Sequence, residues 1–222
     1  MKYSAKGAAP AVFVAWLALK NEEWSPTYAA LSGAPKEALV SALLEEQGHL
    51  CAYCGVRVGV GGLRYHIDHF WPQSHFNGGS PPDLTLDYNN LFISCGPLDG
   101  KDNSRTCGDH KSDWFDTVHY VIPSDPASEL RFRYLASGDI EPSLLGDSGA
   151  ENMITTLNLQ DPSLAYQRRV LLEALELDIS TGAISPLTKP DEIARWRTAD
   201  VDGRCLSLSQ VAARYLEDEP LI

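Results

Sequence analysis

The chain has 222 residues, of which 44% are hydrophobic and 22% are charged, a composition that suits a globular protein with its own core. Its net charge of −12 argues against binding nucleic acid by bulk electrostatic attraction, so such contacts would have to be local, metal-assisted or supplied by a partner. No apolar run approaches the roughly 20 residues that cross a bilayer, so we expect a cytoplasmic protein without a membrane partner.

Two helices are predicted before the first cysteine, over residues 10–20 and 35–48. In the second helix, Leu39 and Leu43 share one face, and Gly48 is a typical residue for a helix end. We therefore assign residues 1–48 to an N-terminal helical segment.

A hairpin is predicted over residues 56–70. The segment "VRVGV" alternates apolar residues, Gly61 and Gly62 offer a turn, and the alternation resumes before Pro72 ends strand pairing. We assign residues 49–118, which contain this hairpin and four of the five cysteines, to a central core.

Residues 119–222 are expected to be mainly helical. A small hairpin is predicted around Gly138, followed by two helical pieces that break near Asp161 and Pro162 and by a last helix in "SLSQVAARYLED". Most of the acidic excess lies in residues 139–222. This region is our candidate for the surface that docks to a partner.

Cysteine spacing indicates a structural zinc site. The pair in "CAYC" can place two thiolates on one ion, although a redox pair has the same spacing. The expected ligands of a closed tetrahedral site are Cys51, Cys54, Cys95 and Cys107. Because Cys107 and His110 have CxxH spacing, His110 is an alternative to Cys95. Cys205 stands apart and is expected to be a small buried residue.

The stretch "HIDHF", residues 66–70, carries side chains suited to hydrolysis. Asp68 is a hard oxygen ligand for magnesium or manganese, and a neutral His69 can take a proton from water. Neighbouring side chains on a strand face opposite sides, but Pro72 indicates that the strand ends here, so both residues can turn inward. His66 is expected to be structural, or to support Asp68 from the same strand face.

Two residues further along the chain complete this candidate site. Asn90 can orient the base through hydrogen bonds, and His110 can supply a second ligand for the ion. The order is therefore aspartate and histidine, then asparagine, then histidine, interleaved with the four cysteines.

In this order the motifs resemble those of the HNH, or ββα-metal, nuclease family. Its zinc-bearing members share a CxxC pair, an Asp-His dyad followed by proline, an Asn-Leu pair leading to a cysteine, and a final cysteine ahead of a metal ligand and a lysine. The matching residues are Cys51, Cys54, Asp68, His69, Pro72, Asn90, Leu91, Cys95, Cys107, His110 and Lys111. Segments such as "IDHFWPQS" and "TTLNLQDPSLAYQRR" are further similar to the HNH subunit of Septu and some retron anti-phage defence systems.

The resemblance implies an α+β fold with a zinc-stabilised ββα-metal core, N-terminal helices and a mainly helical C-terminal region. It implies an endonuclease, with DNA the favoured substrate, in which His69 is the base and Asn90 holds the His69 loop. Asp68 and His110 would bind Mg²⁺ or Mn²⁺, while the four cysteines hold Zn²⁺. An ABC or SMC-like ATPase subunit would form a hetero-oligomer with the chain in the bacterial cytoplasm.

Departures from the family pattern leave some roles open. Gly108 stands where the family commonly has asparagine, so Asn103 is a weaker alternative to His110 as the second ligand. Lys111 or Arg64 is expected to contact a phosphate. The alternatives for the activity are an RNase with a tRNA-type target and a catalytically decayed zinc-binding adaptor.

Overall fold

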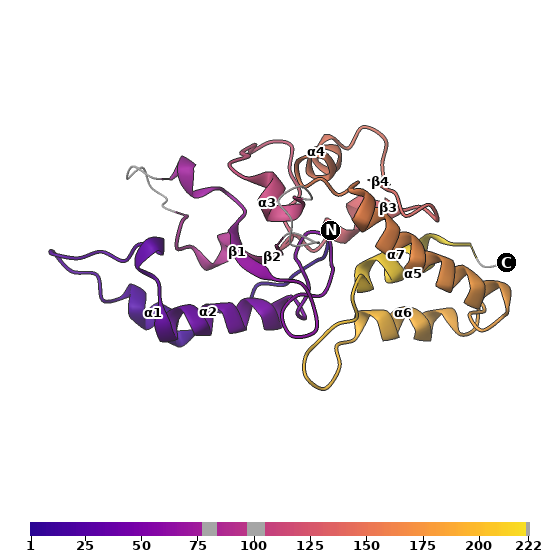
Figure 1. Cartoon of the computed structure of the whole chain (residues 1–222), viewed down its shortest axis with the longest axis horizontal. Helices are drawn as coiled ribbons and strands as arrows, with labels where there is room; N and C mark the ends of the chain where they lie inside the picture. The colour runs from indigo at the N-terminus through magenta and orange to yellow at the C-terminus, as the bar shows by residue number, and fades with distance from the viewer. Residues whose placement is uncertain (77–83, 97–104, 221–222) are drawn as a thin grey trace.

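The structure, a computed structural model, describes residues 1–76, 84–96 and 105–220. The molecule is elongated (Figure 1): α1 and α2 lie at one end, β1, β2 and α3 lie in the middle, and α5, α6 and α7 lie at the other end. The described elements are seven α-helices, four short 3-10 helices and two separate two-stranded sheets. The chain is therefore an α+β protein, as the sequence predicts.

Both N-terminal helices are present. The first, α1 (Ala11–Leu17), is shorter than predicted, and the second is α2 (Gly33–Glu46), whose buried face carries Leu39 and Leu43. A 3-10 helix, η1 (Tyr28–Ala30), lies between them. The predicted end of α2 is confirmed, because Gly48 adopts a φ of 58°, a conformation that glycine reaches at little cost.

The central sheet pairs β1 (Tyr65–His69) with β2 (Leu91–Cys95) in antiparallel register, with His66 opposite Ser94. The 3-10 helices η2 (Gln73–His75) and η3 (Tyr88–Asn90) occupy the connection between the strands, and α3 (Cys107–Lys111) contacts β2. The predicted hairpin over residues 56–70 is wrong. Positive φ angles at glycines 59 and 61 fold this segment into a tight loop with isolated bridges, so β1 pairs with β2.

The hairpin around Gly138 is confirmed, with β3 (Phe132–Tyr134) antiparallel to β4 (Ile140–Pro142) after the short helix η4 (Ser128–Arg131). Two helices follow, α4 (Ser148–Thr156) and α5 (Pro162–Ser180). They break where predicted, because the Asp161 side chain accepts a hydrogen bond from the Ser163 N–H and Pro162 occupies the first turn of α5.

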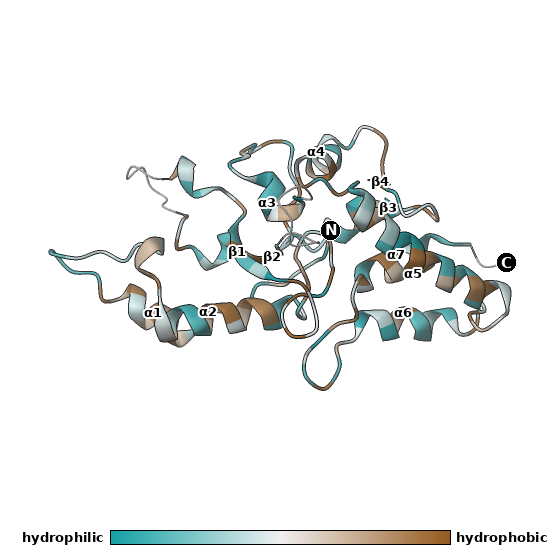
Figure 2. Cartoon of the chain, viewed as in Figure 1, coloured by the Kyte–Doolittle hydropathy of each residue, from teal (hydrophilic) through white to brown (hydrophobic). Residues whose placement is uncertain are grey.

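The last predicted helix is α7 (Ser209–Asp218), most of which is buried. It packs against α6 (Lys189–Arg197), a helix that the sequence analysis does not anticipate. Figure 2 shows why: α6 is mostly hydrophilic, whereas α2 and α5 carry clear hydrophobic stretches. Within α6, Trp196 is the buried residue.

Buried hydrophobic side chains form one cluster that runs from the N-terminal segment through the four cysteines to α7. Core residues of the central region, such as Phe70 and Ile93, therefore belong to the same cluster as Leu216 of α7. Among the described residues, no helix combines the length and apolar character needed to cross a membrane.

Candidate metal centre and active site

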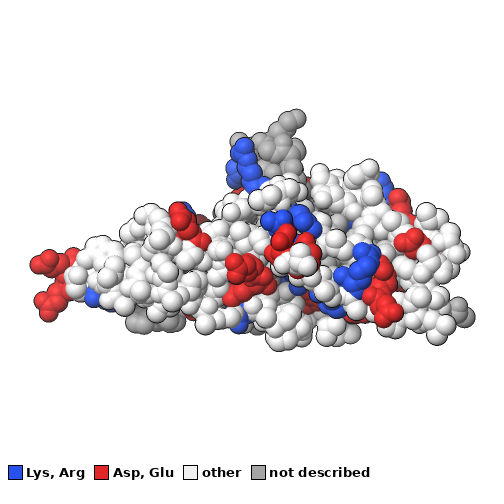
Figure 3. Space-filling model, turned by 90° about the horizontal axis from the view of Figure 1, so that it is seen from below, with Lys and Arg blue, Asp and Glu red and all other residues white. Residues whose placement is uncertain are grey.

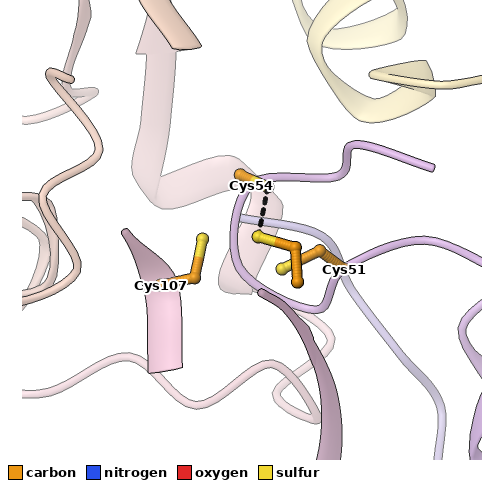
Figure 4. A group of neighbouring side chains, drawn as sticks. Cys51, Cys54 and Cys107 are labelled. Carbon is orange, nitrogen blue, oxygen red and sulfur yellow. Dashed lines mark hydrogen bonds between the residues drawn. The ribbon is translucent and has the colours of Figure 1, made fainter. Parts of the chain in front are cut away.

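Four cysteines come together in the middle of the molecule. The sulfur atoms of Cys51, Cys54, Cys95 and Cys107 all lie within 4.8 Å of one another, and all four residues are buried. Figure 4 shows Cys51 and Cys54 on one loop, with Cys107 approaching them from a separate segment of the chain. Thiolates at this separation are the usual ligands of a tetrahedral structural zinc site, so the residues fit the predicted metal.

Local structure explains how such distant residues meet. The knuckle that carries Cys51 and Cys54 is closed by a hydrogen bond of 2.9 Å from the Gly55 N–H to the Cys51 carbonyl. Cys95 is the last residue of β2, and Cys107 is the first residue of α3. A backbone hydrogen bond of 3.0 Å from the Ala52 N–H to the Ile93 carbonyl joins the knuckle to β2 and so brings Cys95 close to Cys51 and Cys54.

The pKa values of the Cys51 and Cys107 thiols are shifted in opposite directions. Burial alone would raise the pKa of Cys51, but hydrogen bonds from the other three thiols outweigh it and lower that pKa well below its ordinary value. Burial raises the pKa of Cys107 well above its ordinary value, and hydrogen bonding to the Cys51 sulfur raises it further. Four thiols buried this close together need a cation to balance their charge before all of them can be thiolates.

Helix α7 supports the knuckle from the C-terminal region. The Gln210 side chain donates a hydrogen bond of 2.9 Å to the Cys54 carbonyl, and the Leu208 N–H donates one of 2.7 Å to the Gly55 carbonyl. There is no room for a side chain at Gly55, because a Cβ there would overlap the Gln210 amide. Cys205 lies outside the cluster and is half-buried, so it is less enclosed than predicted.

Asp68 lies on β1 next to the cysteine cluster, and its two carboxylate oxygens face different groups. Oδ2 accepts a hydrogen bond from the Tyr53 hydroxyl and lies 3.4 Å from the Lys111 ammonium group. Oδ1 faces the backbone of Gly108 at the start of α3. The two groups at Oδ2 hold the carboxylate in place and leave Oδ1 directed toward α3.

His69 ends β1 and is buried at 6% exposure. Its Nε2 lies 2.9 Å from the Thr85 carbonyl oxygen, and its Nδ1 lies 3.4 Å from the Gln73 side-chain nitrogen. Because a carbonyl can only accept, Nε2 carries the proton of the neutral ring and Nδ1 carries the lone pair. The Tyr28 ring packs edge-on against the imidazole, with 4.4 Å between the ring centroids.

Asn90 ties the segment after His69 to the end of η3. Its side-chain oxygen accepts a hydrogen bond of 2.8 Å from the Trp71 N–H, and its amide nitrogen donates bonds of 3.0 Å to the carbonyls of Trp71 and Leu84. The Asn90 carbonyl also accepts from the Phe70 N–H at 2.9 Å. These bonds join the segment after His69 to η3, and the role of Asn90 in the site stays a prediction.

Lys111 is placed differently from the expectation of a phosphate contact. Its side chain is 1% exposed, and its ammonium group donates a hydrogen bond of 2.8 Å to the His69 carbonyl. An enclosed ammonium that already bonds the β1 backbone and faces Asp68 is not available to a phosphate, so Lys111 acts here as a clamp on the strand end. Arg64, in contrast, is exposed just before β1 and stays a candidate for a phosphate contact.

The structure does not place His110 in the cysteine cluster, which contains Cys95. His110 is exposed, and its Nδ1 donates a hydrogen bond of 2.8 Å to the Thr156 carbonyl at the end of α4. Asn103, the weaker alternative for the second ligand, lies outside the described residues.

Three residues around His69 were missed by the sequence analysis. Tyr28, Gln73 and Thr85 contact the imidazole from the N-terminal segment and from the connection between β1 and β2. Gln73 could have been found from its position four residues after His69. Tyr28 and Thr85 carry no local signal, because their contacts depend on how distant segments pack.

No family model matches the chain, and no curated protein matches it. What can be said of the site therefore depends on its own residues and geometry.

Proposed function

We propose that the protein is a metal-dependent endonuclease of the HNH type that hydrolyses phosphodiester bonds of nucleic acid, with DNA as the favoured substrate. The observation that carries the proposal is the placement of Asp68 and His69 side by side at the end of β1, where Asn90 bonds the segment that follows and Asp68 faces the start of α3, which carries Cys107 of the cysteine cluster. The order of β1, β2 and α3 supports it, because the resemblance to the family predicts two strands followed by a helix at this place.

His69 acts as the general base in the proposed reaction. With its proton on Nε2 and held by the Thr85 carbonyl, the ring presents the Nδ1 lone pair toward the Gln73 amide. A water molecule that takes the place of this long contact would lose its proton to Nδ1 and attack the phosphorus. Burial against Tyr28 and the Asn90 clamp hold the ring in one orientation, which lowers the entropy cost of reaching the reactive geometry.

Asp68 supplies the carboxylate of the proposed catalytic ion site. A bound Mg²⁺ or Mn²⁺ would contribute positive charge beside the phosphate and its leaving oxygen. Tyr53 and Lys111 anchor Oδ2, so the direction of Oδ1 is fixed before any ion binds. The zinc held by the cysteines is structural in this proposal, because a closed four-thiolate site has no open position for substrate.

We propose that an ABC or SMC-like ATPase subunit binds the nucleic acid, because this acidic chain is not suited to bind it tightly by itself. On the face shown in Figure 3, basic residues lie interspersed with acidic ones, and the described residues there form no broad basic patch. The net charge of −12 likewise disfavours tight binding to a polyanion. A hetero-oligomer in a bacterial anti-phage defence system would resolve this conflict.

The test is to incubate the zinc-loaded protein with plasmid DNA and with tRNA, with and without Mg²⁺ or Mn²⁺. Cleavage of DNA supports the proposal, cleavage of RNA alone favours the RNase alternative, and cleavage of neither, even with the ATPase and ATP, favours a zinc-binding adaptor.

His69→Ala should abolish cleavage while zinc content and folding are retained. His119→Ala is the matched control, because the His119 side chain is exposed, pairs with Asp116 and is not a member of the cysteine cluster. Full cleavage by the His69 variant would reject the base assignment.

A further inference from the structure

Two side chains on one face of β1 point at the start of α3. His66 and Asp68 are two residues apart on the strand, so they project to the same side. A Cβ built at Gly108 would lie 2.9 Å from the His66 Nε2 and 2.9 Å from the Asp68 Oδ1. A nitrogen and an oxygen, both able to bind a metal, therefore approach the same point beside the backbone of Gly108.

Glycine at position 108 is what permits this close approach. Any side chain here would meet both atoms and also the Ser94 Oγ, which lies 2.9 Å from the same point. The Gly108 N–H donates a hydrogen bond of 2.9 Å to Ser94 Oγ, and this bond fixes the start of α3 against β2. The backbone approaches β1 closely, and the imidazole of His66 takes up room that a larger residue at 108 would need.

The surroundings of His66 suit a cation that exchanges with solvent. Asp109 Oδ1 lies 3.8 Å from the His66 Nε2, which adds a second carboxylate beside the pair. The side chains of His66 and Asp109 are 36% and 32% exposed, whereas that of Asp68 is 10% exposed. Asp68 is thus the anchored and more buried ligand, whereas His66 lies where water and a phosphate oxygen can reach a bound ion and complete its coordination.

His110 does not have these features. Its Nδ1 is engaged with the Thr156 carbonyl of a different element, and none of the three atoms nearest to the position of a Cβ at Gly108 belongs to it. To join Asp68 on one ion, the imidazole of His110 would have to bind through its remaining nitrogen without support from a neighbouring carboxylate in the described part of the chain.

We propose that His66, together with Asp68, binds the catalytic divalent ion. The catalytic role of this ion rests on the proposed nuclease function, whereas the ion-binding site itself rests on the geometry around Gly108. A site with an imidazole nitrogen is softer than one of carboxylates alone, so it should bind Mn²⁺ more tightly than Mg²⁺.

The experiment measures Mn²⁺ binding directly, without reference to cleavage. Zinc-loaded protein is titrated with Mn²⁺, and the free ion is followed by its electron paramagnetic resonance signal, for wild type, His66→Ala, His66→Gln and His110→Ala. His119→Ala is the control, because His119 forms a comparable pair with Asp116, at 3.6 Å, elsewhere on the surface. Zinc content and urea unfolding show that each variant is folded, which the exposure of His66 makes the expected result.

We expect both His66 variants to weaken Mn²⁺ binding by at least about tenfold, and the His110 and His119 variants to bind like wild type. The assignment is overturned if His110→Ala loses the site while His66→Ala keeps it, or if wild type binds Mn²⁺ no better than the folded His66 variants. Normal cleavage by His66→Ala would reject this inference and leave the nuclease proposal standing. Mn²⁺ binding that depends on His66 in a protein that cleaves no nucleic acid would reject the nuclease proposal alone.

Discussion

Replacing Asn90 by alanine should loosen the connection that positions His69. The Asn90 side chain makes three hydrogen bonds to backbone groups of Trp71 and Leu84, and the residue is 3% exposed. Water cannot easily replace these bonds, so the buried Trp71 N–H and the two carbonyls would lose their partners. At a net value of about 0.5–1.5 kcal/mol for each bond, the variant should lose about 2–4 kcal/mol of unfolding free energy.

Urea denaturation of the zinc-loaded protein measures this loss. Asn89→Ala is the matched control, because Asn89 is exposed and its side chain bonds only Asp87 among the described contacts, so its cost should be within about 0.5 kcal/mol. Asn90→Asp keeps an acceptor for the Trp71 N–H but turns a carboxylate oxygen toward two carbonyls, so it should destabilise the protein at least as much as alanine. Cleavage, assayed where the variants are folded, should fall for both Asn90 variants and not for Asn89→Ala. A loss below about 1 kcal/mol in Asn90→Ala, equal to that of the control, would refute the clamp.

Two further predictions concern stability. Cys54→Ser should lose zinc and cooperative unfolding, because zinc binding is coupled to folding. Cys205→Ser, which removes the thiol outside the cluster, should keep both. Metal content and circular dichroism measure this, and a stable zinc-free Cys54 variant would contradict the four-cysteine site. Burial alone would raise the pKa of Glu129, but Lys2, the Tyr3 N–H and Arg197 together lower it below its ordinary value of 4.5. A lowered carboxylate pKa stabilises the fold above that value and ceases to do so as the pH falls through the folded pKa, so wild type should lose stability in this acid range more steeply than Glu129→Gln. Parallel pH profiles of the two proteins would show that Glu129 makes no such contribution.

Local sequence signals predicted the helices well. Apolar spacing in α2, the Asp161–Pro162 start of α5 and the glycine turn at Gly138 each depend on neighbours in the chain, and each appears in the structure. Helix α6 was missed because its sequence is hydrophilic, although Pro190 near its start and acidic residues in its first turn are recognisable start signals.

The sequence predicted which residues belong to the candidate site better than it predicted how they are arranged in space. The CxxC pair and the later cysteines indicated a cluster, and the structure brings all four sulfur atoms together. The wrong hairpin arose because alternation within residues 56–70 cannot reveal that the partner of β1 lies beyond Tyr88. The burial of Lys111 and the convergence of His66 and Asp68 on Gly108 depend on the packing of α3 against β2, which no single stretch of the sequence encodes.

The hydrogen bonds from α7 to the cysteine knuckle bear on how the protein can be divided for experiment. A fragment that stops at residue 118 would lack Gln210 and Leu208, leaving the carbonyls of Cys54 and Gly55 without these donors. Cutting there would also remove Leu216 and its neighbours from the shared core. The shortest piece expected to keep the cysteine cluster intact therefore extends through α7. Binding and activity should be measured on the intact chain, not on a truncated central region.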